Sequence, residues 1–231
     1  MTKKINGGSD SLRVPAALKT ELEQFFANSH DNGDSINNEP YEAVAGYIQE
    51  TLAERGKGHR EIDTWSGEKI RPLDPNPEKI HVEDVAHGLS NVGRFAGQGQ
   101  EFYSVARHSV HVSLEVEARG GDKAAQRYAL VHDAAEAYLS DVPGPVKKSL
   151  PGYKHAERRL DAAVVTAFGL EVDADTEAAV KAADKVVGMH ELATQFPNGG
   201  HKEADLHHDP SVVEGNADKT AFLERANHLH I

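Results

Sequence analysis

A helical pattern runs from His81 almost to the end of the chain and leaves few folds open to it. Apolar residues recur there at intervals of three and four, and short segments rich in Gly, Pro or polar residues interrupt them. The expected helices lie at 82–93, 103–118, 122–140, 153–168, 173–194 and 216–229. No internal repeat and no long heptad run is present. The sequence therefore predicts an all-α domain.

The first 60 residues are expected to form a helical extension of this domain. Pro15 and Pro40 each stand at the start of an apolar pattern, where a missing amide costs no hydrogen bond, and Gly56 ends the second pattern. We divide the chain into an N-terminal extension at 1–60 and one main domain at 61–231. A single main domain suits 231 residues of which 39% are hydrophobic.

A short segment rich in Trp and Pro follows the extension. From Thr64 to Pro77 the chain holds Trp65 and three prolines. Proline removes a backbone donor and breaks a helix interior, so the segment is expected to form a non-helical hairpin or an ordered loop.

Composition excludes several kinds of function. The chain has no cysteine, which excludes disulfides, thiolate nucleophiles and zinc sites built from Cys. Its formal net charge of −12 argues against broad binding to nucleic acid, which depends on Lys and Arg. No apolar run approaches the roughly 18 to 20 residues needed to cross a bilayer, and the N-terminus lacks the apolar centre of a secretory signal. We expect a cytoplasmic protein, in the host cytoplasm if it is viral, without a membrane or a stable nucleic-acid partner.

Two polar residues, His132 and Asp133, stand inside an otherwise apolar pattern that is expected to be helical. A buried carboxylate beside an imidazole is costly to desolvate, and a divalent metal ion would satisfy both. Successive helical residues point about 100° apart, so the two side chains can converge on one ion. Glu136 returns to the same face and can reach a metal-bound water without being a ligand.

Two further ligands are expected from other helices. His108 in the segment SVARHSVH and Asp184 in the segment VKAAD both lie on expected helices. Either residue alone is more typical of an ordinary helix position than of a metal ligand. Together with His132 and Asp133, they complete a set of two imidazoles and two carboxylates, which favours a metal site.

This order of residues, H…HD…D on three helices, resembles the HD-domain phosphohydrolase superfamily. The resemblance covers about residues 64–195 and is carried by the stretches at 93–95, 102–109 and 132–147. The chain is similar to the bacterial 5'-deoxynucleotidases and, more closely, to small phage phosphohydrolases that include dATP triphosphohydrolases. The resemblance implies an all-α HD bundle with open metal positions for water and substrate. The ligand set that it implies is His108, His132, Asp133 and Asp184.

The chemistry implied by this resemblance is hydrolysis at a metal-bound water. A divalent ion lowers the pKa of its water from 15.7 to about 7 and neutralises a phosphoryl oxygen. Glu136 would orient that water or exchange a proton with the nucleophile or the leaving oxygen. Asp141 resembles a second acidic residue that the nucleotidases use near the substrate sugar or water.

Substrate contacts are also implied by the resemblance. Arg94, Lys147 and Lys181 occupy positions that resemble phosphate contacts in the phage enzymes. Phe95 stands where relatives carry an aromatic residue against the nucleoside, and many of them have Trp there. Trp65 fits equally well as a core anchor of its loop and as a partner of the base.

These expectations lead to one first hypothesis and two alternatives. The first is a triphosphohydrolase that cleaves dATP to deoxynucleoside and triphosphate. The second is a 5'-deoxynucleotidase that acts on a monophosphate, and the third is a protein that senses nucleotides without turnover. The ligand set suits zinc, manganese, iron, cobalt or nickel, with magnesium or a second metal on the substrate phosphates. By analogy with relatives, we expect a homo-oligomer, either a dimer or a hexamer.

Other histidines are expected to be structural. His111 lies one turn after His108, but the family pattern does not use it, so we interpret it as structural or as a neighbour of the ligands. The C-terminal histidines show no organised ligand spacing and predict a solvated tail rather than a second metal site. They are His201, His207, His208, His228 and His230.

Overall fold

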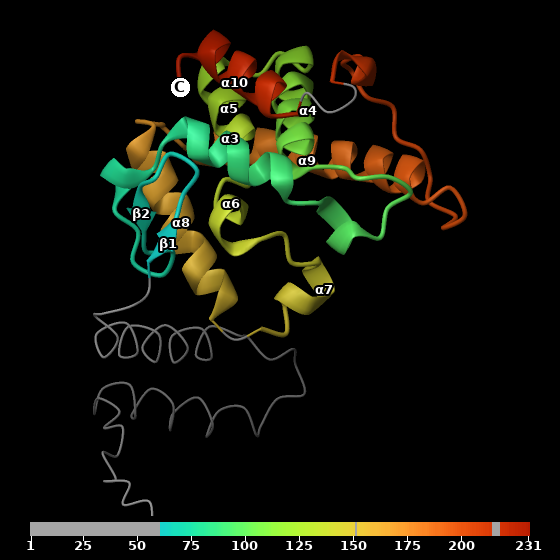
Figure 1. Ribbon diagram of the computed structural model, residues 1–231. Helices are drawn as coiled ribbons and strands as arrows, with labels where there is room; N and C mark the ends of the chain where they lie inside the picture. Colours follow the sequence, from blue (N-terminus) through green and yellow to red (C-terminus); the bar gives the residue numbers. More distant parts are fainter. Residues whose placement is uncertain (1–60, 151, 214–217) are drawn as a thin grey trace, which may run out of the picture.

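The computed structural model describes residues 61–150, 152–213 and 218–231 (Figure 1). These residues are mostly helical and include one small two-stranded hairpin, which confirms the expected helical fold at this level. The predicted helical extension at 1–60 lies outside the described residues. Within the described ranges, no helix is both long and apolar enough to cross a membrane.

The described residues form two short strands, α-helices and short 3-10 turns (η). They are β1 (Ile62–Asp63), β2 (Lys69–Ile70), η1 (Pro77–Lys79), α3 (Val82–Asn91), η2 (Arg94–Gly97), α4 (Val105–Ala118), α5 (Lys123–Val131), α6 (Glu136–Leu139), α7 (Gly144–Lys147), α8 (Tyr153–Ala167), α9 (Ala174–Gln195), η3 (Pro210–Val212) and α10 (Asp218–Leu229). The expected hairpin around Trp65 is found as β1 and β2, paired antiparallel with Asp63 opposite Lys69.

Most predicted helix boundaries agree with the structure. Five of the six expected helices appear as α3, α4, α8, α9 and α10, with ends that differ by no more than two residues. The prediction of one helix at 122–140 is wrong, because α5 ends at Val131 and residues 132–135 form turns before α6. The expected break after that helix also contains a short helix, α7.

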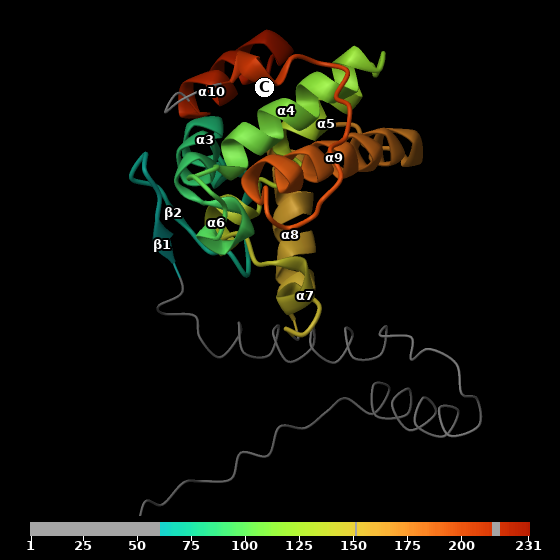
Figure 2. The ribbon, with the colours of Figure 1, turned by 90° about the vertical axis from the view of Figure 1, so that its right-hand side faces the viewer.

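Helix α4 lies at the centre of the described domain, in contact with α3, α5, α9 and α10 (Figures 1 and 2). Its apolar residues, including Val105 and Val112, are fully buried, as are Leu130 of α5 and Phe222 of α10. Burial of such side chains is the main favourable term in folding. The packing fixes α4 as a rigid support for the polar residues that it carries.

The start of α4 is also fixed by polar contacts. The Ser104 hydroxyl accepts the Arg107 amide at 3.0 Å, which caps the helix, and donates to Asp218 of α10 at 2.5 Å. The guanidinium of Arg107 donates to the same carboxylate at 3.0 Å. These contacts set the position of the first turn of α4, and His108 follows directly on it.

Candidate metal centre

Residues from three parts of the chain meet at one point. His108 comes from α4, His132 and Asp133 from the turns between α5 and α6, and Asp184 from α9. The Nε2 atom of His108 lies 3.6 Å from Oδ2 of Asp133 and 3.2 Å from Oδ1 of Asp184. The Nε2 atom of His132 lies 3.3 Å from the same Asp133 oxygen. The structure thus brings all four sequence-predicted ligands together.

Three of these residues have donor atoms close enough to share one ion. One donor atom each from His108, His132 and Asp133 lies within 4.8 Å of the other two. Two imidazoles with a carboxylate form a donor set that suits divalent transition metals. The group can therefore hold a metal ion, and Asp184 stands beside it as a fourth donor.

The two imidazole rings are oriented by contacts on their far sides. Nδ1 of His132 donates to the carbonyl oxygen of Ala129 at 2.8 Å, because a carbonyl can only accept. Nδ1 of His108 lies 2.9 Å from Oε1 of Glu191. Both Nε2 atoms are buried and have no hydrogen-bond partner among the described residues. Such orphaned nitrogens beside carboxylates fit a metal ion, which completes their coordination.

The contact between His132 and Ala129 also explains why the expected helix is interrupted. In a continuing α-helix, the carbonyl of Ala129 would accept the amide of Asp133, and here it accepts a ring nitrogen. The following amides of Ala134 and Glu136 bond to carbonyls three residues back, as in a tighter turn. The chain still winds in the right-handed sense, with His132 at φ −60°.

The carboxylates around His108 favour a positive charge on its ring. Burial and Arg94 lower the pKa of His108, but Glu191 and Asp184 outweigh them and raise it to about 9. Burial raises the pKa of Asp184, whereas His108, His132 and Arg94 hold it well below its usual range. The centre is therefore built for a cation at Nε2 of His108, where a metal ion would displace a proton.

Glu136 lies beside this centre in the first turn of α6, and only 5% of its surface is exposed. Burial, Asp133 and Asp141 raise the pKa of Glu136 to about 9, against the opposing charge of Lys147 at 3.3 Å. Burial and the neighbouring carboxylates therefore favour the protonated form of its side chain. A buried neutral carboxylic acid beside a metal centre can donate a proton.

Two of the expected phosphate contacts reach the centre. Arg94 Nη1 lies 3.9 Å from Oδ2 of Asp133, and its Nε lies 2.9 Å from Glu191. The Lys147 ammonium pairs with Glu136 at 3.3 Å and with Glu157 at 2.5 Å. Both cations are therefore already paired with carboxylates.

The other expected substrate contacts are less closely tied to the centre. Lys181 is exposed on α9, one turn before Asp184. The ring of Phe95 packs edge-on against Phe196 at 5.4 Å, beneath the guanidinium of Arg94 at 5.1 Å.

Trp65 is 59% exposed, so the expectation that it anchors its loop in the core is wrong. Its ring stacks on His87 with centroids 5.4 Å apart, and the Lys219 ammonium lies 3.4 Å from the ring centre. These described contacts tie the hairpin to α3 and α10.

Sequence reasoning missed the residue that orients His108. Glu191 is 1% exposed on α9 and lies seven positions after Asp184. Seven residues are almost two helical turns, so the two carboxylates share one helix face. This spacing of seven residues after Asp184 is the sequence signal that could have identified Glu191.

The prediction of a solvated histidine tail is wrong for His208. Its side chain is 7% exposed, with Nδ1 2.9 Å from Glu115 and Nε2 2.9 Å from Nδ1 of His111. The other tail histidines have exposed side chains, as expected, but His207 also bonds to Glu115 and His228 lies on α10. His111 is buried within this second cluster, in agreement with a structural role.

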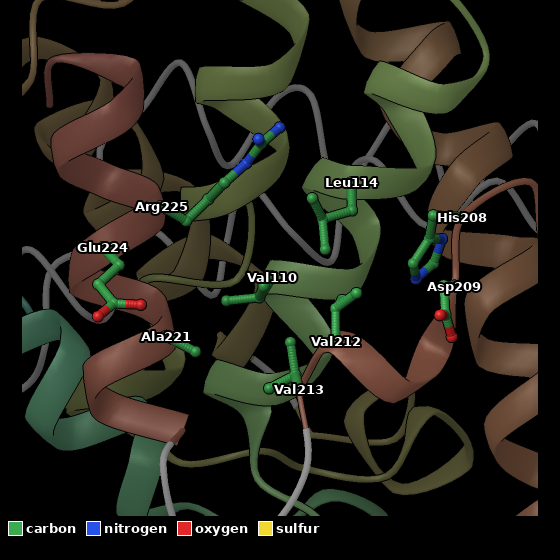
Figure 3. Close-up of a pocket in the computed structure, with 9 residues that line it drawn as sticks. All are labelled: Val110, Leu114, His208, Asp209, Val212, Val213, Ala221, Glu224 and Arg225. Carbon is green, nitrogen blue, oxygen red and sulfur yellow. The ribbon is translucent and has the colours of Figure 1, made fainter.

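A pocket of about 260 Å³ lies beside the second cluster, between α4, α10 and the segment before α10 (Figure 3). Val110 and Leu114 line it from α4, Val213 from the segment before α10 and Ala221 from α10. Its lining contains none of the four candidate ligands.

Comparison with known proteins finds relatives whose functions are not described. The chain is 42% identical to an uncharacterized protein of Rhodobacter capsulatus over 163 residues, which are 66% of this chain and 82% of that protein. It is 40% identical to the uncharacterized protein YfdR of Escherichia coli over 134 residues, which are 58% of this chain and 69% of that protein. No family model matches the chain.

Proposed function

We propose that this chain, which belongs to the same family as the Rhodobacter capsulatus and Escherichia coli proteins, is a metal-dependent phosphohydrolase that cleaves a phosphate ester of a small nucleotide. The observation that carries this proposal is the convergence of two orphaned imidazole nitrogens on Asp133, next to the buried carboxyl group of Glu136. The resemblance to HD-domain phosphohydrolases supports it.

Partial exposure of the carboxylates favours a catalytic site over a structural one. The His108 side chain is fully buried, whereas that of Asp133 is 26% exposed and that of Asp184 is 43% exposed. A structural metal site is closed to solvent by its ligands, whereas a catalytic site keeps a coordination position open to water and substrate. The exposed side of this centre is where a phosphate would approach.

Each group of residues has a separate role in the proposed hydrolysis. His108, His132, Asp133 and Asp184 would hold the metal. When bound, a divalent ion supplies a water with a pKa near 7 and neutralises charge on a phosphoryl oxygen. Glu136 donates a proton to the leaving oxygen, and Asp141 lies close enough to raise the pKa of Glu136. The guanidinium of Arg94 balances negative charge on the phosphate.

The first candidate substrate is dATP, which the enzyme would cleave to deoxynucleoside and triphosphate. Zinc, cobalt or manganese would be the cofactor, and magnesium or a second metal would neutralise the substrate phosphates. This choice follows from the resemblance to phage dATP triphosphohydrolases. A deoxynucleoside monophosphate is the second candidate, and one observation favours it. Arg94 is paired with Glu191 and Lys147 with two glutamates, so neither of these two cations offers unbalanced positive charge to a triphosphate.

One experiment tests the activity and separates the substrates. Common nucleotides are incubated at the mono-, di- and triphosphate level with each metal, and products are followed by liquid chromatography and phosphorus NMR. Inorganic triphosphate from dATP supports the first candidate, and orthophosphate from dAMP without attack on dATP supports the second. Bound nucleotide with no product in any metal would overturn the enzymatic proposal in favour of a sensor.

A further inference from the structure

The carboxylate of Glu191 lies at the base of the candidate metal centre and touches side chains from two other segments. Oε1 lies 2.9 Å from Nδ1 of His108, and Oε2 lies 2.9 Å from Nε of Arg94. The phenol of Tyr103 is a third partner, through a hydrogen bond to the same carboxylate. One buried anion thus joins a metal ligand to an expected phosphate contact.

Burial of the Glu191 carboxylate costs desolvation free energy, which only well-placed partners of opposite charge can offset. Removing a carboxylate from water costs several kcal/mol, and opposite charges offset that cost only in good geometry. The ring of His108 lies at hydrogen-bond distance from one oxygen of Glu191, and Arg94 forms an ion pair with the other at 2.9 Å without hydrogen-bond alignment. The ring of His108 is therefore held so that Nδ1 faces Glu191 and Nε2 faces Asp184 and Asp133.

Arg94 is placed by the same anion. Its guanidinium packs against α9 at Gly188. A methyl side chain at this position would already be in van der Waals contact with Nη2, at 3.9 Å. The contact with Glu191 brings Nη1 to 3.9 Å from Oδ2 of Asp133. The Arg94 side chain is only 14% exposed, so little freedom remains for it to move away.

We propose that Glu191 is a positioning residue that aims Nε2 of His108 at the metal and holds Arg94 beside Asp133 for the substrate phosphate. This inference rests on the metal centre of the proposed function. Carboxylates that orient a histidine ligand typically change metal affinity about 10- to 100-fold when they are replaced. Glu191 would therefore set both how tightly the metal binds and how well the phosphate is received.

The sharpest variant is Glu191→Gln, which keeps the size of the side chain. Its amide is neutral and has one acceptor oxygen, so it cannot both accept from His108 and balance the charge of Arg94. Glu191→Asp keeps the charge but is shorter by one methylene, and it should restore part of the function. Glu177→Gln, at an exposed position of the same helix, is the matched control.

The measurements use the zinc ion alone and then substrate. Competition with a chelator should give a zinc dissociation constant about 10- to 100-fold higher for Glu191→Gln than for wild type. The KM of the active nucleotide should also rise, because Arg94 is displaced. The control should match wild type in both. Zinc affinity and KM that are unchanged in Glu191→Gln would overturn the proposal.

A measurement on wild type covers the case in which Glu191→Gln does not fold. The ¹⁵N NMR spectrum of the zinc-loaded protein should show His108 bound through Nε2, with a proton on Nδ1. Coordination through Nδ1 would overturn the positioning role and leave the metal centre intact. Failure of wild type to bind zinc or any other transition metal would instead overturn the proposed function.

Discussion

Helix α4 contributes to two clusters of histidine and carboxylate, which differ in whether their ring nitrogens have hydrogen-bond partners. In the candidate metal centre, His108 contacts Glu191, and its Nε2 is left without a hydrogen-bond partner among the described residues. In the second cluster, which we call the strap cluster, Glu115, His111, His207 and His208 bond to one another.

The strap cluster satisfies its own polar groups. The fully buried carboxylate of Glu115 accepts from Arg119 at 2.7 Å, from the His207 amide at 2.8 Å and from the ring of His208 at 2.9 Å. Nε2 of His208 also lies 2.9 Å from Nδ1 of His111. The comparison shows that histidine beside a buried carboxylate does not by itself indicate a metal. What distinguishes the metal centre is that unsatisfied nitrogens converge on one point.

The largest expected effect is at the metal centre. Asp133→Ala removes the carboxylate that lies between both imidazole Nε2 atoms. Metal binding should be lost, and turnover should fall by more than about 10⁴-fold, because the metal-activated water is lost with it. Metal analysis of the purified protein and a nucleotide assay measure both. His208→Ala, in the strap cluster, should retain the metal. Stoichiometric metal in Asp133→Ala would contradict the assignment.

A smaller loss of activity is expected when the proton donor is removed. Glu136→Ala should keep the metal and reduce turnover by about 10²- to 10⁴-fold, since positioned acid–base groups contribute that much. The metal content separates this variant from Asp133→Ala. An equally active Glu136→Ala enzyme with a full complement of metal would refute the role of this residue.

The sequence predicts the helices well where local signals decide them. Pro, Gly and capping residues such as Asp173 mark helix ends, and the apolar pattern fixes the faces between them. The interruption after Val131 was not predictable in the same way. It depends on a hydrogen bond from the ring of His132 to the carbonyl oxygen of Ala129. The helix propensities of the residues do not predict such a bond.

The residues of the two clusters also differ in whether the sequence could predict them. His132 and Asp133 stand out because they are polar in an apolar pattern, and His108 and Asp184 follow from the resemblance. The strap cluster could not be found in this way, since His208 and Glu115 are 93 residues apart in the chain. A contact between such distant residues exists only once the helices have packed.

The strap cluster should matter for stability rather than for activity. Glu115→Gln leaves buried histidine donors without their anion and breaks the contact with Arg119. Breaking a buried ionic network typically costs about 3 kcal/mol or more. For a chain of this size, that lowers the melting temperature by about 10 °C. Zinc affinity should be unchanged. Glu101→Gln, at an exposed loop position, is the control. A variant as stable as wild type would contradict the structural role.

The smallest expected effect is a dependence of stability on pH through His111. Burial and His208 lower the pKa of His111 to about 3 in the folded protein, far below the 6.5 of an exposed histidine. Between these values the unfolded chain binds more protons than the folded one, so stability falls as pH falls. Lowering the pH from 7.5 to 5.5 should cost about 1 kcal/mol through this residue.

His111→Gln isolates this term, because it removes the titrating ring and leaves groups such as His108 in place. Urea unfolding of wild type and variant at pH 7.5 and 5.5 gives the two pH dependences. The stability of wild type should fall more than that of the variant, by about 1 kcal/mol. Equal losses in the two proteins would mean that His111 is protonated in the fold, which its burial and the nearby ring of His208 oppose. The strap cluster would then resemble the metal centre, where the surrounding carboxylates favour a charged ring.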